Sequence, residues 1–422
     1  MLRIFVFLVF LIHQSWAISL SEVVQRALEK NPELSALRQE LRSANLSLSA
    51  EKQLFLPEFF FTYTYTYNFE KQTFNIPIFG GLRVESAKKS YQTFQAGLRY
   101  TIFDGFARNF SVALASSNLK SKEFLLKEKV ESLKLDVISA YLDVLSAKGV
   151  VSAIEKQRSA VLLQVQTAEA FYQKGLVAIT DVLQAKVRLA EVERDLRKAQ
   201  GDYRVALANL SRLSGIPEEE LLNLEEPKVE VDVKPLEFYL QRAKERNILK
   251  AQRQAIEAFR AQRGIAKSQF FPKLFVEGVY TYSDQNPSIR PKGVFGIVGG
   301  VALSFQGIRP YYQELSFGAL ELKAQKEYED LLDKVQLEVK RAYEELLVAQ
   351  DNLKVAQSAL AFAEKFFELS KEQYANQIIS QRELLEAEAS LTKAKVDSVI
   401  AYYQFLKQYY RLLIASGLEV EP

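Results

Sequence analysis

The stretch VESLKLDVISAYLDVLSAKGVVSAIEKQRSAVLLQVQTAEAFY, residues 130–172, decides the fold. Reading every third and then fourth position gives an apolar series with one charged member. Its members are Val130, Leu133, Val137, Ala140, Val144, Ala147, Val151, Ile154, Arg158, Val161, Val165, Ala168 and Tyr172. A 3.5-residue apolar period is typical of a coiled-coil seam. We therefore predict a long helix that packs along partner helices.

The same seam returns 202 residues further along the chain, with one polar member. It comprises Leu332, Val335, Val339, Ala342, Leu346, Ala349, Leu353, Ala356, Leu360, Ala363, Phe367, Ser370 and Tyr374. No Gly or Pro stands between Gly318 and Gly417, so the backbone of this copy permits helix throughout. At 1.5 Å per residue, a helix from Ser111 to Tyr172 would be roughly 90 Å long. Such a rod needs neighbouring helices along most of its length.

Each rod is predicted to fold back on itself as a helical hairpin. The seam spacing continues past Tyr172, so one unbroken rod is the alternative. Gly175, however, is a natural helix C-terminus, and Thr180 or Asp181 a natural restart. In the second copy, the spacing of Ser380 and Glu383 fits a capping box. We place the two tips near residues 174–180 and 376–380.

Between these helical stretches the period changes from helix to strand. After a predicted amphipathic helix from Leu20 to Gln53, capped by Ser19 or Ser21, Pro57 ends the helical pattern. Aromatic residues then alternate with mostly hydroxyl residues. The aromatic set is Phe59, Phe61, Tyr63, Tyr65 and Tyr67, and the other set is Phe60, Thr62, Thr64 and Thr66. An ordinary soluble strand is the commoner explanation, but an aromatic outer face and a polar inner face are what a lipid-embedded barrel strand requires.

The segment from Asn68 to Lys89 has the composition of a loop, and a second strand follows it. Asp104 and Gly105 then turn the chain into the first long helix. The whole series recurs after a linker, so the chain is predicted to be a tandem duplication. The predicted parts are a signal peptide (1–17), a first repeat (18–215), a linker (216–235), a second repeat (236–417) and a tail (418–422). The first repeat contains strands at about 58–68 and 91–103, and the second repeat contains strands at about 273–283 and 293–305. The linker contains a short helix from Glu218 to Leu222.

Composition narrows the function further. Arg3, an apolar run to Ile12 and the small residues Ser15 and Ala17 predict a signal peptide that is cut after Ala17. The remaining chain would contain no Cys, His, Trp or Met, which removes thiol and imidazole catalysis and the usual ligands of zinc, copper and haem. The net charge of +3 is too small to indicate nucleic acid as a partner. We expect no catalytic residues, no cofactor and no metal.

Four strands cannot close a transmembrane barrel, because about eight is the smallest number seen. Exposed strand edges are not tolerated inside lipid, so several copies must pool their strands. The fold class predicted is therefore mainly helical with membrane β-structure, a coiled-coil barrel continuous with a β-barrel.

The chain resembles the outer membrane efflux protein family, the TolC-like channels of Gram-negative export systems. The most specific local match is the sequence Tyr172-Gln173-Lys174-Gly175 followed by Asp181-Val182-Leu183 and Ala185, and its second copy Tyr374, Glu383-Leu384-Leu385 and Ala387. The resemblance implies a homotrimer in the outer membrane, with a twelve-stranded barrel and a twelve-helix periplasmic tunnel. It implies passive export, in an efflux or type I secretion system, from an inner-membrane transporter through a periplasmic adaptor.

The resemblance also implies roles for individual residues. The periplasmic gate would comprise Glu383, Glu386, Tyr374 and Asp181, and the adaptor-docking tips Gly175, Leu176, Val177, Gln377, Ile378 and Ile379. Ile379 stands where some members carry a gate arginine, and Gln377 replaces the second tip glycine, so the gate would be built differently. The alternative is that the two glutamates are solvated surface carboxylates and that the apolar tip residues only pack the hairpin ends.

Two other classes of function were weighed against the channel. A periplasmic coiled-coil scaffold would explain the rods but leaves the aromatic strands unexplained. An enzyme that uses carboxylates alone, such as a glycosidase, is disfavoured because the Asp and Glu residues have helix-surface spacing rather than a pocket-forming context.

Overall fold

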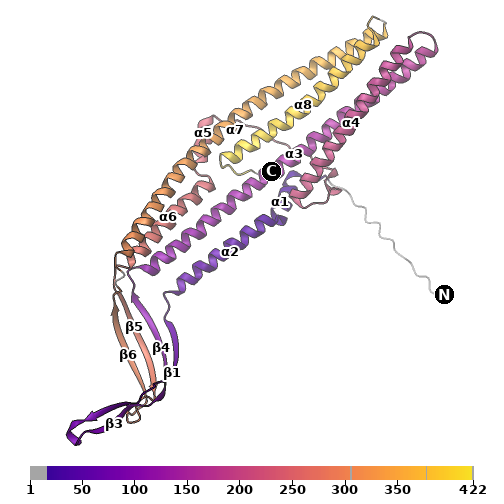
Figure 1. The fold of residues 1–422 in the computed structure, drawn as a ribbon. Coiled ribbons are helices and arrows are strands. Elements are labelled where there is room, and N and C mark those ends of the chain that lie inside the picture. The colour runs from indigo at the N-terminus through magenta and orange to yellow at the C-terminus, as the bar shows by residue number, and fades with distance from the viewer. Residues whose placement is uncertain (1–16, 305–306, 377, 421–422) are drawn as a thin grey trace, which may run out of the picture. The chain divides into compact units, whose positions relative to one another are not determined.

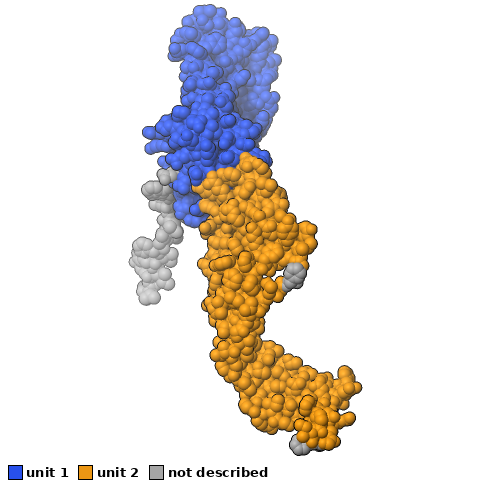
Figure 2. Space-filling model, turned by 90° about the vertical axis from the view of Figure 1, so that its left-hand side faces the viewer, with its two compact units in different colours: residues 1–38, 125–249, 330–422 blue, residues 39–124, 250–329 orange. Residues whose placement is uncertain are grey.

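The computed structural model describes residues 17–304, 307–376 and 378–420, and it divides into two compact units (Figure 2). Unit 1 comprises residues 1–38, 125–249 and 330–422, and unit 2 comprises residues 39–124 and 250–329. Most of the predicted signal peptide therefore lies outside the described residues.

The helices repeat as a series (Figure 1). They are α1 Leu20–Lys30, α2 Pro32–Gln53, α3 Ala107–Gln173, α4 Ile179–Ser214, α5 Leu236–Ala243, α6 Asn247–Ser268, α7 Arg309–Ala375 and α8 Gln381–Ala415. Helices α3 and α7 both have 67 residues and begin 202 positions apart, the same offset as the seam. Of the predicted linker helix, a 3-10 turn, η2, forms at Glu220–Leu222. The duplication seen in the sequence is thus a duplication of structural elements.

The predicted single helix from Leu20 to Gln53 is wrong, because two helices meet at Asn31. Asn31 is extended, as the residue before a proline must be, and Pro32 begins α2. The Asn31 side-chain oxygen accepts a hydrogen bond from the Leu34 backbone N–H at 3.1 Å. At the start of α1 the capping residue is Ser19, which accepts from the Glu22 N–H at 3.3 Å.

In unit 1, Tyr141 of α3 ties the N-terminal segment to the linker. Its ring is fully buried, and its hydroxyl lies 3.0 Å from the Ile18 carbonyl oxygen and 2.6 Å from that of Glu225. Burial raises the pKa of the Tyr141 hydroxyl, so it remains a hydrogen-bond donor. Ile18 in turn forms a parallel bridge with Leu224.

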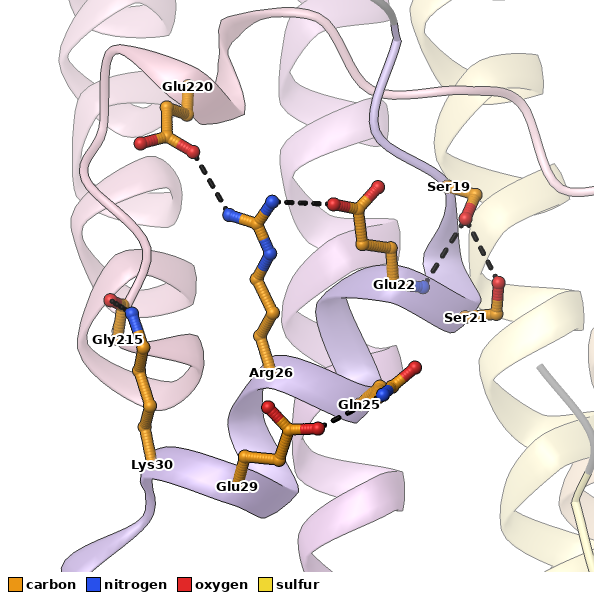
Figure 3. Close-up of polar contacts among 9 residues, drawn as sticks. All are labelled: Ser19, Ser21, Glu22, Gln25, Arg26, Glu29, Lys30, Gly215 and Glu220. Atoms are coloured by element: carbon orange, nitrogen blue, oxygen red, sulfur yellow. Dashed lines mark hydrogen bonds and ion pairs between the residues drawn. The ribbon is translucent and has the colours of Figure 1, made fainter.

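Figure 3 shows the polar contacts that hold α1 to the end of α4 and to η2. The Arg26 guanidinium lies 2.6 Å from Glu22 and 3.0 Å from Glu220. The Lys30 ammonium donates to the Gly215 carbonyl oxygen at 3.4 Å, and Gly215 has the positive φ of a helix C-terminus.

Arg246 takes the place of Lys30 in the second repeat and binds more partners. It lies 2.5 Å from Glu128 of α3 and 2.7 Å from Glu338 of α7, and it donates to the Ala415 carbonyl oxygen at 3.3 Å. Only 10 % of the Arg246 side chain is exposed, so its charge-assisted contacts are largely shielded from water. Through them, one side chain connects α3, α7 and α8.

Unit 2 contains a four-stranded antiparallel sheet with the order β1-β4-β5-β6. The strands are β1 Glu58–Tyr67, β4 Ser90–Phe103, β5 Lys273–Ser283 and β6 Gly293–Ala302. Strand β6 ends before the predicted boundary at 305, a residue outside the described ones. Among the described residues no further strand joins this sheet, so β1 and β6 each leave one edge unpaired.

The register sorts the side chains of this sheet into two faces, because directly paired residues share a face. One face carries Phe59, Phe61, Tyr63, Tyr65 and Tyr67 of β1, Phe94 and Leu98 of β4, Tyr280 and Tyr282 of β5, and Phe295, Ile297 and Val301 of β6. The opposite face has the threonines of β1, Gln95 and the ion pair of Arg99 with Glu277 at 2.7 Å, together with a few apolar side chains, including Phe60, Val294 and Val298. The predicted aromatic face is confirmed, and the register assigns a side to the glycine-rich β6 that alternation could not.

The predicted loop from Asn68 to Lys89 is wrong, because most of it forms a second sheet. Strand β2, Gln72–Ile76, pairs with β3, Leu82–Ala87, across the 3-10 turn η1, Pro77–Phe79. Gly80 and Gly81, both at positive φ, complete the turn. The strands are short and the turn residues dominate the composition, which hid the alternation in the sequence.

At the other end of the four-stranded sheet, Asp104 turns β4 into α3. Its carboxylate accepts from the Arg108 N–H at 3.2 Å and from the Arg108 side chain at 2.8 Å. The same guanidinium donates to the Leu54 carbonyl oxygen at 3.3 Å. A β-carbon on Gly105 would lie 2.6 Å from the Ser268 carbonyl oxygen, so only glycine fits between strand and helix here.

Candidate functional site at the helical hairpin tips

The first tip ends α3 with a glycine-centred motif. Gly175 has φ +65°, its N–H donates to the Tyr172 carbonyl at 2.9 Å, and the Leu176 N–H donates to the Phe171 carbonyl at 2.9 Å. These two bonds are those of a Schellman motif, which satisfies the last carbonyls of a helix. Helix α4 then begins at Ile179. The predicted turn is therefore present, and Gly175 ends helix α3 as predicted.

The second tip is built in the same way but closed by a stronger cap. The Ile378 N–H donates to the Gln373 carbonyl at 2.8 Å, five residues back, as at the first tip. Gln377 lies outside the described residues. Ser380 then caps α8, its side chain accepting from the Glu383 N–H at 3.4 Å. The predicted capping box is confirmed.

The apolar tip residues divide into exposed and partly covered ones. Leu176 is 64 % exposed and Ile378 69 %, whereas Val177 and Ile379 are half-buried. The two exposed residues stand at matching places of the two repeats. Packing the hairpin end accounts for Val177 and Ile379, and it leaves Leu176 and Ile378 free for a partner.

The carboxylate of Glu383, predicted for the gate, is bound to its own helix start. It accepts from the Ser380 N–H at 2.7 Å and from the Ser380 hydroxyl at 2.9 Å. These bonds hold the pKa of Glu383 below its usual value. In the single chain, Glu383 is thus a charged capping residue.

The other predicted gate residues have different surroundings. Glu386 is exposed on α8. Tyr374, on α7, is half-buried; burial first, and then the charge of Asp181 on α4, raise its hydroxyl pKa. The charge of Asp181 thus acts on Tyr374 from the other helical hairpin.

The sequence interpretation missed Glu388, the most unusual carboxylate of the region. It is 3 % exposed, and neither carboxylate oxygen reaches a hydrogen-bond donor among the described residues. Burial raises its pKa to about 7, an effect that the nearby amide of Gln164 on α3 and the charge of Arg188 on α4 only partly offset. Its spacing could have indicated the burial of Glu388, because it follows Leu384 by four residues and Leu385 by three. This spacing places it on the apolar side of α8.

Long helical hairpins joined to a small amphipathic sheet define a class of fold found in solved outer membrane channels. One such structure is the outer membrane protein VceC of Vibrio cholerae, with a TM-score of 0.78 and 20 % identity over 95 % of this chain and 97 % of that one. Another is the CmeC outer membrane channel of Campylobacter jejuni, with a TM-score of 0.77 and 18 % identity over 94 % of this chain and 85 % of that one.

The sequence comparisons give the family itself. The outer membrane protein TolC of Vibrio cholerae is 22 % identical over 92 % of this chain and 90 % of its own length. The sequence model described as outer membrane efflux protein matches residues 23–216, essentially the first repeat. The resemblance is thereby confirmed: over its first repeat the chain matches the model of the outer membrane efflux protein family. It is a transport channel protein of the outer membrane with a large periplasmic helical part, and not an enzyme.

Glu388 gives this region a pH-dependent stability. Because the folded state holds the proton more tightly than the unfolded state, where the pKa is near 4.5, the group stabilises the fold most below 4.5, and this contribution falls as the pH rises to 7. Glu388→Gln removes the charge, so we expect it to stabilise the folded chain by roughly 1–3 kcal/mol at pH 8 and little at pH 5. The measurement is the melting temperature at both pH values, at one detergent and protein concentration.

Glu386→Gln, at an exposed position of the same helix, is the matched control and should shift the melting temperature little at either pH. An equal shift at pH 5 and pH 8 for Glu388→Gln would contradict the assignment.

Proposed function

We propose that three copies of this chain form an exit duct, with a twelve-stranded barrel in the outer membrane and twelve periplasmic helices. The observation that carries the proposal is the four-stranded sheet, which has an aromatic outer face and two edge strands unpaired in the described chain. Lipid cannot satisfy the free N–H and C=O groups of β1 and β6. Pairing β6 of one copy with β1 of the next satisfies both edges, and twelve strands exceed the minimum for closure.

The inner face of such a barrel suits an aqueous passage. It would present threonines, Gln95 and the Arg99–Glu277 ion pair, while the exposed rings of β1 face lipid. No chemistry is needed for conduction, so solutes pass from an inner-membrane pump and a periplasmic adaptor to the exterior. The duct fits a tripartite efflux system and a type I secretion system equally.

The alternative function is a periplasmic coiled-coil scaffold without a channel. It accounts for the seams of α3 and α7 but gives no reason for a sheet that exposes Phe59 at 70 % and Ile297 at 75 %. A water-soluble scaffold would cover such a face or avoid it.

Extraction and electrophoresis test the assembly. The duct should leave membranes only with detergent, run as a heat-dissociable trimer on gels, and form conducting pores in planar bilayers, because its sheet closes only in lipid or detergent as an oligomer. A stable monomer that dissolves without detergent would instead establish the scaffold.

The proposed gate is tested by replacing Glu383 and Glu386 together with glutamine. Three copies of two carboxylates at one constriction attract cations, so the double variant should lose much of the cation preference of the single-channel current. Ser380→Ala, which weakens the same cap by about 1 kcal/mol but keeps both carboxylates, is the control. Unchanged conductance and ion preference in the double variant would remove these residues from the gate.

The proposed adaptor contact depends on the two exposed tip residues. Leu176→Asp with Ile378→Asp should weaken binding of the cognate adaptor roughly tenfold or more, since loss of an apolar anchor costs about 1–2 kcal/mol. Gln173→Asp adds charge at an exposed but polar tip position and should have a small effect. Surface plasmon resonance with the trimer in detergent measures both, and equal effects would argue against tip docking.

A further inference from the structure

The β2–β3 hairpin of unit 2 is an addition that the duplicated fold does not require. In the second repeat, residues 284–292 alone join β5 to β6, whereas in the first repeat the connection between β1 and β4 contains a complete hairpin. It leaves the four-stranded sheet at the end opposite the helices (Figure 1). Its base is fixed there, because Lys88 lies 2.8 Å from Asp284 and its N–H donates to the Gln285 carbonyl at 2.8 Å.

The hairpin is amphipathic. Phe74 pairs with Val84, so these two side chains and that of Ile76 lie on one face. The opposite face carries two polar pairs, Thr73 with Glu85 and Asn75 with Arg83. This separation needs an apolar surface against which the first face can pack.

The apolar side chains of the hairpin and its flank are nevertheless exposed. Phe69 and Ile78 are both 89 % exposed, and Phe74 is 62 % exposed. An isolated two-stranded hairpin is marginally stable in water at best, and covering three large apolar side chains would stabilise it. The face is therefore built for contact.

The charge at this end of the sheet identifies the contact. Residues 68–90 and 284–292 contain six Lys and Arg against three Asp and Glu, a net charge of +3. Hairpins from sister copies would bring like charges together, whereas an anionic surface would be attracted.

The level of the hairpin along the sheet points to the same partner. Tyr67, the last residue of β1, is 53 % exposed on the aromatic face, and the Lys89 ammonium lies 5.5 Å from its ring centre. Tyrosines at strand ends, with lysines beside them, mark the boundary between hydrocarbon and headgroups. The hairpin would thus emerge where phosphate groups begin.

We propose that the β2–β3 hairpin is a membrane-surface anchor, which rests its apolar face on the outer leaflet with its cations on phosphate-bearing lipid headgroups. The inference rests on the proposed outer membrane duct. Phe74 and Ile78 enter the headgroup region, and Lys71 and Lys89, both exposed, bind phosphate.

The test uses the absence of cysteine from the full chain. Ile78→Cys, in the exposed turn between the two strands, and Thr73→Cys, on the polar face, each supply one thiol for an environment-sensitive fluorophore. The assembled protein is placed in vesicles of phosphatidylcholine with or without lipid A, a phosphorylated lipid. We expect the Ile78→Cys probe to be blue-shifted and to be quenched severalfold more by doxyl-labelled lipid than the Thr73→Cys probe, most strongly with lipid A.

Charge and assembly controls complete the test. Adding Lys71→Gln and Lys89→Gln should remove most of the lipid A effect. A probe at Ile78→Cys that acrylamide quenches as readily as the Thr73→Cys probe, or one that is blue-shifted in detergent but not quenched by doxyl lipid, would overturn the anchor in favour of free or mutually packed hairpins. If the vesicles still conduct, only this inference fails; if the protein does not enter vesicles, the duct fails with it.

Discussion

The need of every backbone N–H and C=O group for a partner governs this protein. Helices α3 and α7 satisfy their backbone hydrogen bonds internally. Their apolar seams therefore contact neighbouring helices through side chains alone. The sheet does not satisfy this need within the described residues, because β1 and β6 each keep one unpaired edge and its aromatic face is exposed. In the proposed duct, assembly would therefore be a condition of the fold in the membrane, and the inner face would line the passage.

Much of the fold could be predicted from periodicity. The seam, the repeat offset of 202 and the change to alternation after Pro57 each depend on many residues, so local exceptions such as Arg158 did not matter. The predictions were wrong where one or two residues determine the local structure. Pro32 split a helix whose apolar pattern ran straight through it, and the β2–β3 strands were too short for their alternation to outweigh Pro77 and two glycines.

The candidate site was less predictable, because a sequence pattern does not show which neighbour a side chain meets. The spacing of Ser380 and Glu383 predicted the capping box, yet the same glutamate was also expected to serve the gate, and only the structure shows its carboxylate turned to the cap. Glu388 was missed because burial is set by α3 and α4, which are distant in sequence. Family resemblance named Tyr374 and Asp181, whose role in a gate stays a prediction, although the charge of Asp181 does act on Tyr374.

The buried carboxyl of Glu388 makes the stability of the helical hairpins sensitive to pH. The carboxyl, on α8, lies near Gln164 of α3 and Arg188 of α4, in the helical part of the chain. Because burial raises the pKa of Glu388 to about 7, a change of pH near neutrality would change the packing of these three helices. The stability of the helical hairpins would then depend on the pH of the compartment that contains them.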